Sequence, residues 1–322
     1  MINVSDLNGI ELITIENDSI RATFLPQVGG KMVELTNLKT GSQFLLEPKG
    51  GLREIKLPAY GDPYEREFAY GFDECFPTIS PSPNPETPEN KEMEGIEFPD
   101  HGELWSRPWK YDIKGEKLML HAFGVQSDYV FRKIVTFEGN KIKFEYFLKS
   151  FSEVSQNYVW CAHVMLKVAS GARIVLPSSV KEVFLDHASD PAVGKPGTKI
   201  AWPPKAGPHK TDLSVVGEFQ SGLEAKFFAD SLHEGSAELI YPSGRESIKF
   251  NFDSTMIPVV GIWLSYGGWP PEDGRKELAI AIEPGRGKSD SLVAAFERGE
   301  AAVLKAGAED SWSWSLTVAD KK

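Results

Sequence analysis

The sequence predicts an all-β protein, a large antiparallel β-sandwich with one or two short helices. Apolar and polar residues alternate with the period of two that is typical of half-buried strands, and short glycine-containing turns separate the alternating segments. These patterns run from the first thirty residues to the last ten, with no linker of biased composition between them. We therefore expect residues 1–322 to form a single domain.

The expected strands begin with segments 19–25 and 30–37, SIRATFL and GKMVELTN. Three pairs of alternating segments flank short glycine-containing turns and are expected to form β-hairpins. These turns are 114–116, 138–140 and 242–244. Alternation from Trp312 to Val318 predicts the last strand.

The best helix signal is SDSLVAAFERGE. Ser289 or Asp290 can cap its start, and Gly299 can end it. The segment from Pro77 to Pro99 resists assignment to a central strand, because proline removes a ladder donor. Long loops in compact domains are often functional, and this one leads directly to His101. We expect it to form one wall of a cleft.

The charge balance excludes some classes of partner. The chain carries 35 Lys and Arg against 46 Asp and Glu, a formal net charge of −11, with no basic stripe. Affinity for nucleic acids depends on phosphate neutralisation by Lys and Arg, and anionic membranes also attract basic surfaces. We therefore expect neither partner, and the balance favours a small neutral ligand.

Cys75 and Cys161, the only cysteines, do not make a disulfide framework and are expected to be reduced and largely buried. The first residues, MINVSDLNGIELITIEND, lack a basic region followed by an apolar core. No apolar run approaches the roughly 20 residues that span a bilayer. We expect a cytoplasmic protein, monomeric or homodimeric.

Three residues are candidates for acid–base chemistry. His163 lies in the apolar run NYVWCAHVMLKV, where a buried imidazole needs hydrogen-bond partners. Glu283 comes at the end of an apolar strand, just before Pro284, where partial desolvation can raise the pKa of a carboxylate. His101 lies in the turn PDHG. Taken singly, each also has an ordinary structural interpretation.

Five segments together resemble the aldose 1-epimerases, also called galactose mutarotases. They occur in the family's order and span nearly the whole chain: PQVGGKMVELTNLKTGSQFLL, GFDECFPTISP, HGELWSRPW, WCAHVMLKV and IAIEPGRGKSDSL. The resemblance implies a large β-supersandwich with an open sugar-binding cleft. It also implies that Glu283 is the general base and His163 the general acid, while His101 holds the sugar near its ring oxygen. This chemistry requires no metal and no cofactor.

The resemblance leaves the sugar contacts open. Trp263 is a candidate platform for a sugar ring, and Trp105 a further aromatic candidate. Asp73 and Glu74 are candidate hydroxyl ligands. The related hexose-6-phosphate mutarotases typically carry an arginine three residues after the glycine of the His-Gly pair. Arg107 is off that register, which favours an unphosphorylated monosaccharide.

Four classes of function remain to be compared. The first is a mutarotase acting on a free aldose or, less in keeping with the sequence, on a hexose 6-phosphate. The second is a non-catalytic sugar-binding protein on the same fold. A glycoside-processing enzyme needs two opposed carboxylates, and no second partner for Glu283 is evident. A metalloenzyme built on His101, His163 and Glu283 has no supporting ligand spacing.

Overall fold

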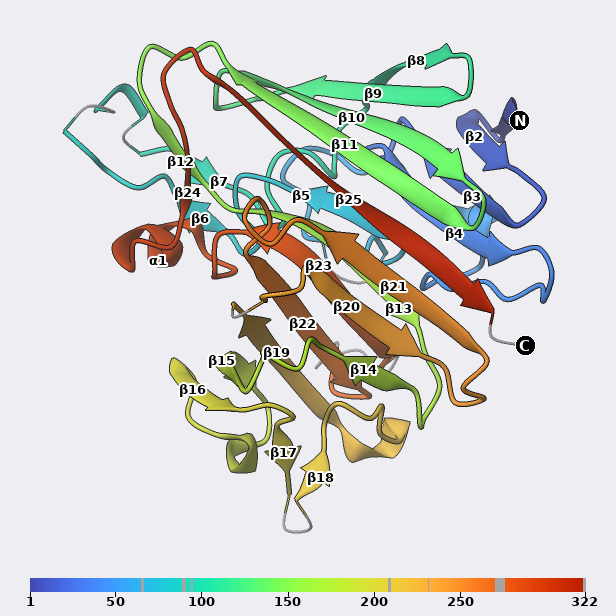
Figure 1. The fold of residues 1–322 in the computed structure, drawn as a ribbon. Coiled ribbons are helices and arrows are strands. Elements are labelled where there is room, and N and C mark those ends of the chain that lie inside the picture. The colour runs from blue at the N-terminus through green and yellow to red at the C-terminus, as the bar shows by residue number, and fades with distance from the viewer. Residues whose placement is uncertain are drawn as a thin grey trace.

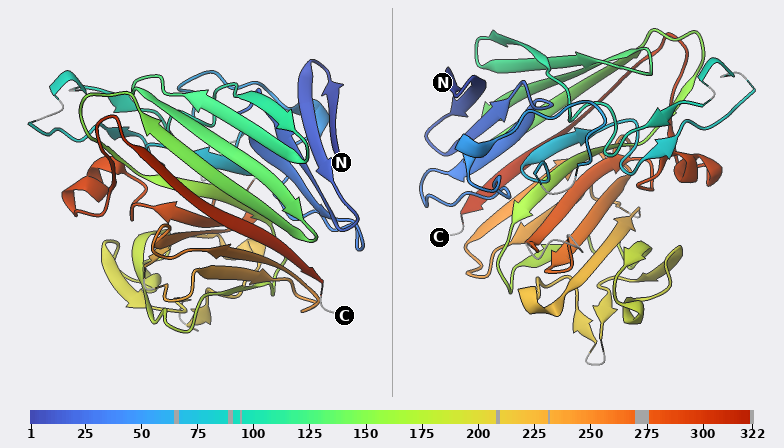
Figure 2. Two further views of the ribbon diagram at one scale, coloured as in Figure 1. Left: turned by 45° about the horizontal axis from the view of Figure 1, so that its top comes forward. Right: turned by 180° about the vertical axis from the view of Figure 1, so that it is seen from behind.

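Two large antiparallel sheets form the two layers of the protein (Figure 1), which confirms the predicted β-sandwich. The computed structural model describes residues 1–64, 67–88, 91–93, 95–207, 210–230, 232–269 and 276–320. The first and last strands of the chain lie in different sheets, and the views of Figure 2 place both termini on the same side of the molecule.

The larger sheet has eleven strands. In spatial order they are β1 (Ile2–Leu7), β2 (Ile10–Glu16), β3 (Ile20–Leu25), β4 (Lys31–Asn37), β5 (Phe72–Cys75), β13 (Trp160–Lys167), β23 (Leu278–Arg286), β22 (Val259–Tyr266), β19 (Leu223–Ala229), β15 (Glu182–Ala188) and β16 (Thr198–Ala201). Its central strands therefore come from four distant parts of the chain.

The second sheet has eight strands. In order they are β14 (Arg173–Val175), β20 (Ser236–Ile240), β21 (Glu246–Phe252), β25 (Glu309–Asp320), β11 (Lys141–Ser150), β10 (Tyr129–Glu138), β9 (Lys117–Phe123) and β8 (Lys110–Lys114). The three predicted hairpins are confirmed as β8–β9, β10–β11 and β20–β21.

Smaller elements complete the described part of the chain. The short strand pairs are β12 (Gln156–Tyr158) with β24 (Ala302–Leu304), β17 (Lys205–Ala206) with β18 (Thr211–Asp212), and β6 (Ser82–Pro83) with β7 (Glu97–Phe98). The 3-10 turns are η1 (Leu52–Glu54), η2 (Lys91–Met93), η3 (Pro191–Val193) and η4 (Phe219–Ser221). One α-helix, α1 (Leu292–Glu297), is found in the described residues.

The main hydrophobic core lies between the sheets. It takes alternate residues of the inner strands, such as Phe144 of β11 and Ile282 of β23, because successive side chains of a strand face opposite sides. Strand β13 is buried on both faces, which explains why its sequence is a continuous apolar run without alternation. Cys75 and Cys161 are both free and buried, as predicted. They lie opposite each other in the register of β5 and β13.

Two local predictions are corrected. Helix α1 is capped by Ser291, whose side chain accepts from the backbone amide of Ala294, and neither Ser289 nor Asp290 is the cap. Glu283 does not end its strand, because β23 continues through Pro284 to Arg286. No helix in the described residues has the length and apolar character needed to cross a membrane.

Candidate functional site

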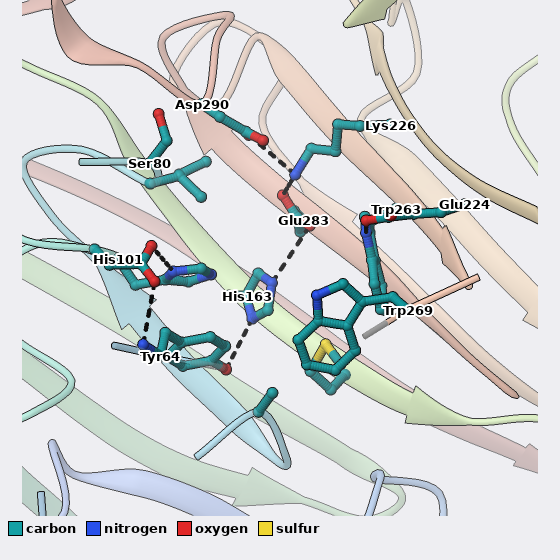
Figure 3. A pocket seen from close by; sticks show the side chains of 14 residues that line it. Tyr64, Ser80, His101, His163, Glu224, Lys226, Trp263, Trp269, Glu283 and Asp290 are labelled. Carbon is teal, nitrogen blue, oxygen red and sulfur yellow. Dashed lines mark hydrogen bonds and ion pairs between the residues drawn. The ribbon is translucent and has the colours of Figure 1, made fainter. Parts of the chain in front are cut away.

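A cavity of about 190 Å³ opens on the outer face of the larger sheet, away from the main core. Its floor comes from β13, β23, β22 and β19, whose lining side chains share one face of the sheet. Its wall comes from loops that include Tyr64, Ser80 and His101 (Figure 3). The proline-rich segment therefore contributes to the wall through Ile79 and Ser80, as expected.

Glu283 lies on the cavity floor with only one of its carboxylate oxygens bonded. Lys226 Nζ lies 2.5 Å from Glu283 Oε2, whereas Oε1 is buried without a hydrogen-bond partner and lies 3.7 Å from His163 Nε2. Burial raises the pKa of Glu283, and the charge of Lys226 opposes that rise. The ion pair with Lys226 offsets part of the charge of Glu283. The free Oε1 can accept a proton from a bound ligand.

Gly261 makes room for this carboxylate. It faces Glu283 across β22 and β23, and a Cβ at this position would lie 2.6 Å from Glu283 Oε2. Any side chain here must displace the carboxylate.

His163 is held from its other nitrogen. Its Nδ1 lies 3.2 Å from the hydroxyl of Tyr64, and that hydroxyl donates to Asp73 Oδ2 at 2.8 Å. Because the Tyr64 proton is directed at Asp73, the hydroxyl accepts from Nδ1–H of His163. Burial lowers the pKa of His163 well below its usual value, and the nearby charges of His101, Lys226 and Lys31 add to this effect. Both effects favour the neutral form of the imidazole.

His101 comes from the turn that follows the proline-rich segment. Its backbone has φ 58°, and the next residue, Gly102, has φ 77° and leaves no space for a Cβ, which would lie 2.1 Å from the carbonyl oxygen of Phe76. His101 Nδ1 lies 2.8 Å from Asp100 Oδ1, and the ring stacks on Tyr64 at 3.7 Å between centroids. In Figure 3 the ring points across the cavity toward His163, 5.0 Å away between centroids.

Lys226 is a site residue that sequence reasoning missed. Its ammonium is bonded to Glu283 and lies 3.1 Å from Asp290 Oδ1. Burial works to lower the pKa of Lys226, but Asp290 and Glu283 outweigh it and raise that pKa, so the lysine is charged. A lone lysine inside the apolar strand LEAKFFA was the signal that could have identified it. Tyr64 was also missed and carried no comparable signal.

Two tryptophans form the far side of the cavity. Trp263 and Trp269 are perpendicular, with centroids 5.5 Å apart, and Trp263 Nε1 donates to Glu224 at 3.2 Å. The candidate platform Trp263 thus lines the same cavity as Glu283, His163 and His101.

Three predicted sugar contacts are not in the cavity lining, and these predictions are corrected. Asp73 is fully buried behind Tyr64 and bonded to Lys31 at 2.6 Å. Glu74 faces the opposite side of β5, inside the main core, since adjacent residues of a strand point to opposite faces. Trp105 is completely buried, and its Nε1 donates to the Asp100 carbonyl, so it supports the His101 turn.

No group of three or more His, Cys, Asp or Glu residues in the described part of the chain is arranged to hold a metal ion.

No protein-family model and no curated protein matches this sequence. Solved structures do match its fold. A protein from Synechocystis sp. PCC 6803 covers 100% of both chains with a TM-score of 0.73 and 14% identity. A galactose mutarotase related enzyme from Lactobacillus acidophilus covers 97% of this chain and 98% of its own, with a TM-score of 0.68 and 14% identity.

A galactose mutarotase-like protein from Lactobacillus casei covers 95% of this chain and 99% of its own, with a TM-score of 0.62 and 14% identity. The chain therefore has the galactose mutarotase-like fold, which confirms the resemblance stated from sequence at the level of architecture. Identities this low show the fold alone, and activity has to be argued from the cavity.

Proposed function

We propose that this protein is an aldose 1-epimerase, an isomerase that interconverts the α and β anomers of a free aldose. The observation that carries the proposal is the buried, unpartnered Oε1 of Glu283, which shares a cavity with His163 and His101. Buried polar atoms are rarely left without a partner, and such an atom on a cavity floor is suited to accept a proton from a ligand.

The reaction needs one base and one acid on opposite sides of the hemiacetal carbon. Glu283 takes the proton of the C1 hydroxyl, and a histidine protonates the ring oxygen as the ring opens. Rotation about the C1–C2 bond exchanges the faces of the aldehyde, and ring closure returns both protons. Burial of Glu283 favours this role, because its raised pKa makes the carboxylate a stronger base.

The cavity is suited to a neutral sugar. Trp263 and Trp269 offer apolar faces for the C–H groups of a pyranose, and Ser80 and Asp290 offer partners for hydroxyls. The described lining residues include four carboxylates but only one lysine and no arginine: Asp100, Glu224, Glu283, Asp290 and Lys226. This balance repels a phosphate group and weighs against a hexose 6-phosphate as the substrate.

Polarimetry tests the proposal. Freshly dissolved α anomers of a panel of free aldoses, including D-galactose and D-glucose, should reach anomeric equilibrium faster with the protein than in buffer. The corresponding 6-phosphates should show little acceleration. If no free aldose responds, the protein is not a mutarotase for these sugars. Calorimetric binding without any acceleration would identify a non-catalytic sugar-binding protein.

A further inference from the structure

We propose that Tyr64 is a positioning residue that holds both histidines of the cavity, His163 through its hydroxyl and His101 through its ring. This inference rests on the proposed function and adds a supporting residue to the site. Tyr64 is only 2% exposed, so it acts through the two imidazoles rather than on a ligand. In Figure 3 the tyrosine lies beside both of them.

The hydroxyl of Tyr64 joins His163 to the body of the protein. It donates to Asp73 Oδ2 at 2.8 Å and lies 3.2 Å from His163 Nδ1. A phenol has a single proton, so a hydroxyl that donates to Asp73 offers only lone pairs to the imidazole. His163 therefore has Nδ1 held by the protein, while Nε2 faces the cavity at 3.7 Å from Glu283 Oε1.

A buried ion pair fixes the direction of this hydroxyl. Asp73 Oδ2 also accepts from Lys31 Nζ at 2.6 Å, and both side chains are fully buried. Lys31 Nζ in turn donates to the carbonyl oxygens of Phe68 and Tyr70, at 2.7 Å and 3.0 Å. The donors of the ammonium are therefore all used. An ion pair held in this way gives the Tyr64 hydroxyl an acceptor in a fixed place.

The ring of Tyr64 supports His101. The two rings are stacked, with 3.7 Å between their centroids and 13° between their planes. Trp105 packs against the same tyrosine at 5.1 Å between centroids, with the planes 88° apart. Such contacts have preferred geometries, so they restrain the rings that make them. His101 therefore lies against a surface that restricts its rotation.

Asp100 closes these contacts into a ring. Its Oδ1 lies 2.8 Å from His101 Nδ1, and its Oδ2 accepts from the backbone amide of Tyr64 at 3.1 Å. One carboxylate thus joins the backbone of Tyr64 to the imidazole on which the tyrosine ring stacks. Tyr64 precedes β5, His101 follows β7, and His163 lies in β13. Tyr64 is therefore the point at which distant segments of the chain are held together around the cavity.

Tyr70 provides a matched comparison, because it also packs on Lys31. Lys31 Nζ lies 4.2 Å from the centroid of the Tyr70 ring and 5.4 Å from that of Tyr64. The hydroxyl of Tyr70 is buried and has no hydrogen-bond partner among the described residues. Tyr64→Phe and Tyr70→Phe each remove one buried phenolic oxygen, and of these two oxygens only that of Tyr64 is bonded to a histidine.

Polarimetry of these two variants is the first test. We expect Tyr64→Phe to lower kcat about 10–100-fold with little change in KM, because His163 loses the partner that fixes its orientation. Tyr70→Phe should stay within about twofold of the wild type, since its oxygen supports no site residue. Equal losses of kcat in the two variants would overturn the proposal, because a general loss of packing would then explain both.

A double-mutant cycle tests whether the hydroxyl acts through His163. In the His163→Asn background, Tyr64→Phe should change the remaining kcat less than about twofold, because the imidazole that it positions is gone. If Tyr64→Phe lowers kcat by the same factor in both backgrounds, the hydroxyl does not act through His163 and the proposal fails.

Tyr64→Leu tests the support of His101. It removes the stacked ring as well as the hydroxyl, so kcat should fall about tenfold further than in Tyr64→Phe. A kcat equal to that of Tyr64→Phe would refute the role of the ring.

Imidazole NMR tests the hydrogen bond without activity. We expect the Nδ1–H of His163 to give a slowly exchanging proton resonance that is lost in Tyr64→Phe and kept in Tyr70→Phe. A resonance unchanged in Tyr64→Phe would refute the contact. A wild-type protein without mutarotation would remove the proposed function, whereas the response of this resonance would still decide whether Tyr64 positions His163.

Discussion

Two buried lysine–carboxylate pairs lie on opposite faces of the larger sheet, and they are completed differently. In the main core, Glu74 Oε1 accepts from Tyr146 at 2.9 Å and lies 3.2 Å from Lys133 Nζ, while Oε2 accepts from Trp160 at 2.9 Å. On the cavity floor, Glu283 has Lys226 on Oε2 and no partner on Oε1.

The difference separates a structural ion pair from a reactive one. Burying a charge costs free energy that only a full set of hydrogen bonds offsets, so the satisfied Glu74 has no capacity left for a ligand. Glu283 keeps one acceptor free at the cost of an incomplete bonding set. An incomplete set is expected where a ligand supplies the missing partner.

The largest expected effect comes from exchanging each carboxylate for an amide. Glu283→Gln should lower the mutarotation rate about 10³-fold or more with little loss of stability, because the base is removed and Lys226 keeps Asp290. Glu74→Gln should destabilise the fold by about 3–5 kcal/mol, because Lys133 is left without a charged partner, yet leave the rate per folded molecule unchanged. Polarimetry measures the rate, and urea unfolding measures the stability. If the two variants lose rate and stability to the same extent, the distinction between the structural pair and the reactive pair fails.

A smaller effect is expected from Gly261→Ala. The new Cβ would lie 2.6 Å from Glu283 Oε2, so the carboxylate must shift. A misplacement of about 1 Å costs on the order of 10²-fold in rate, and we expect the loss in kcat rather than in KM. A kcat equal to that of the wild type would show that the position of the carboxylate is not critical. Thermal unfolding provides the control for a general packing defect.

The architecture could be predicted from the sequence because it depends on local periodicity. Alternation and glycine turns identified the three hairpins and the long last strand, and the continuous apolar run around His163 indicated a buried segment. His101, His163 and Glu283 could be proposed as a set only through resemblance, since they lie on elements far apart in the chain.

The remaining site residues depend on side-chain direction and on distant partners. Asp73 and Glu74 are adjacent, so they face opposite sides of β5, and their lysine partners, Lys31 and Lys133, come from other strands. Lys226 lies 57 residues before Glu283 in the chain. The sequence offers Asp290 as a candidate helix cap, whereas in the structure its Oδ1 lies 3.1 Å from Lys226 Nζ.

The smallest effect at the optimum pH is expected from Lys226→Gln, which tests what the cation adds to the cavity pair. Glu283 must be ionised to act as a base, so activity is lost as the pH falls through its pKa. Burial raises that pKa and Lys226 opposes the rise, so removing the charge should raise it further. The acidic limb of kcat/KM should therefore move to higher pH, while the rate above the limb stays within about tenfold of the wild type. Lys149→Gln, which removes an exposed ion pair with Glu309, is the matched control and should move neither limb. An unmoved acidic limb in Lys226→Gln would mean that the lysine only fills space beside Glu283, and the contrast with the Lys133–Glu74 pair would then rest on the free Oε1 alone.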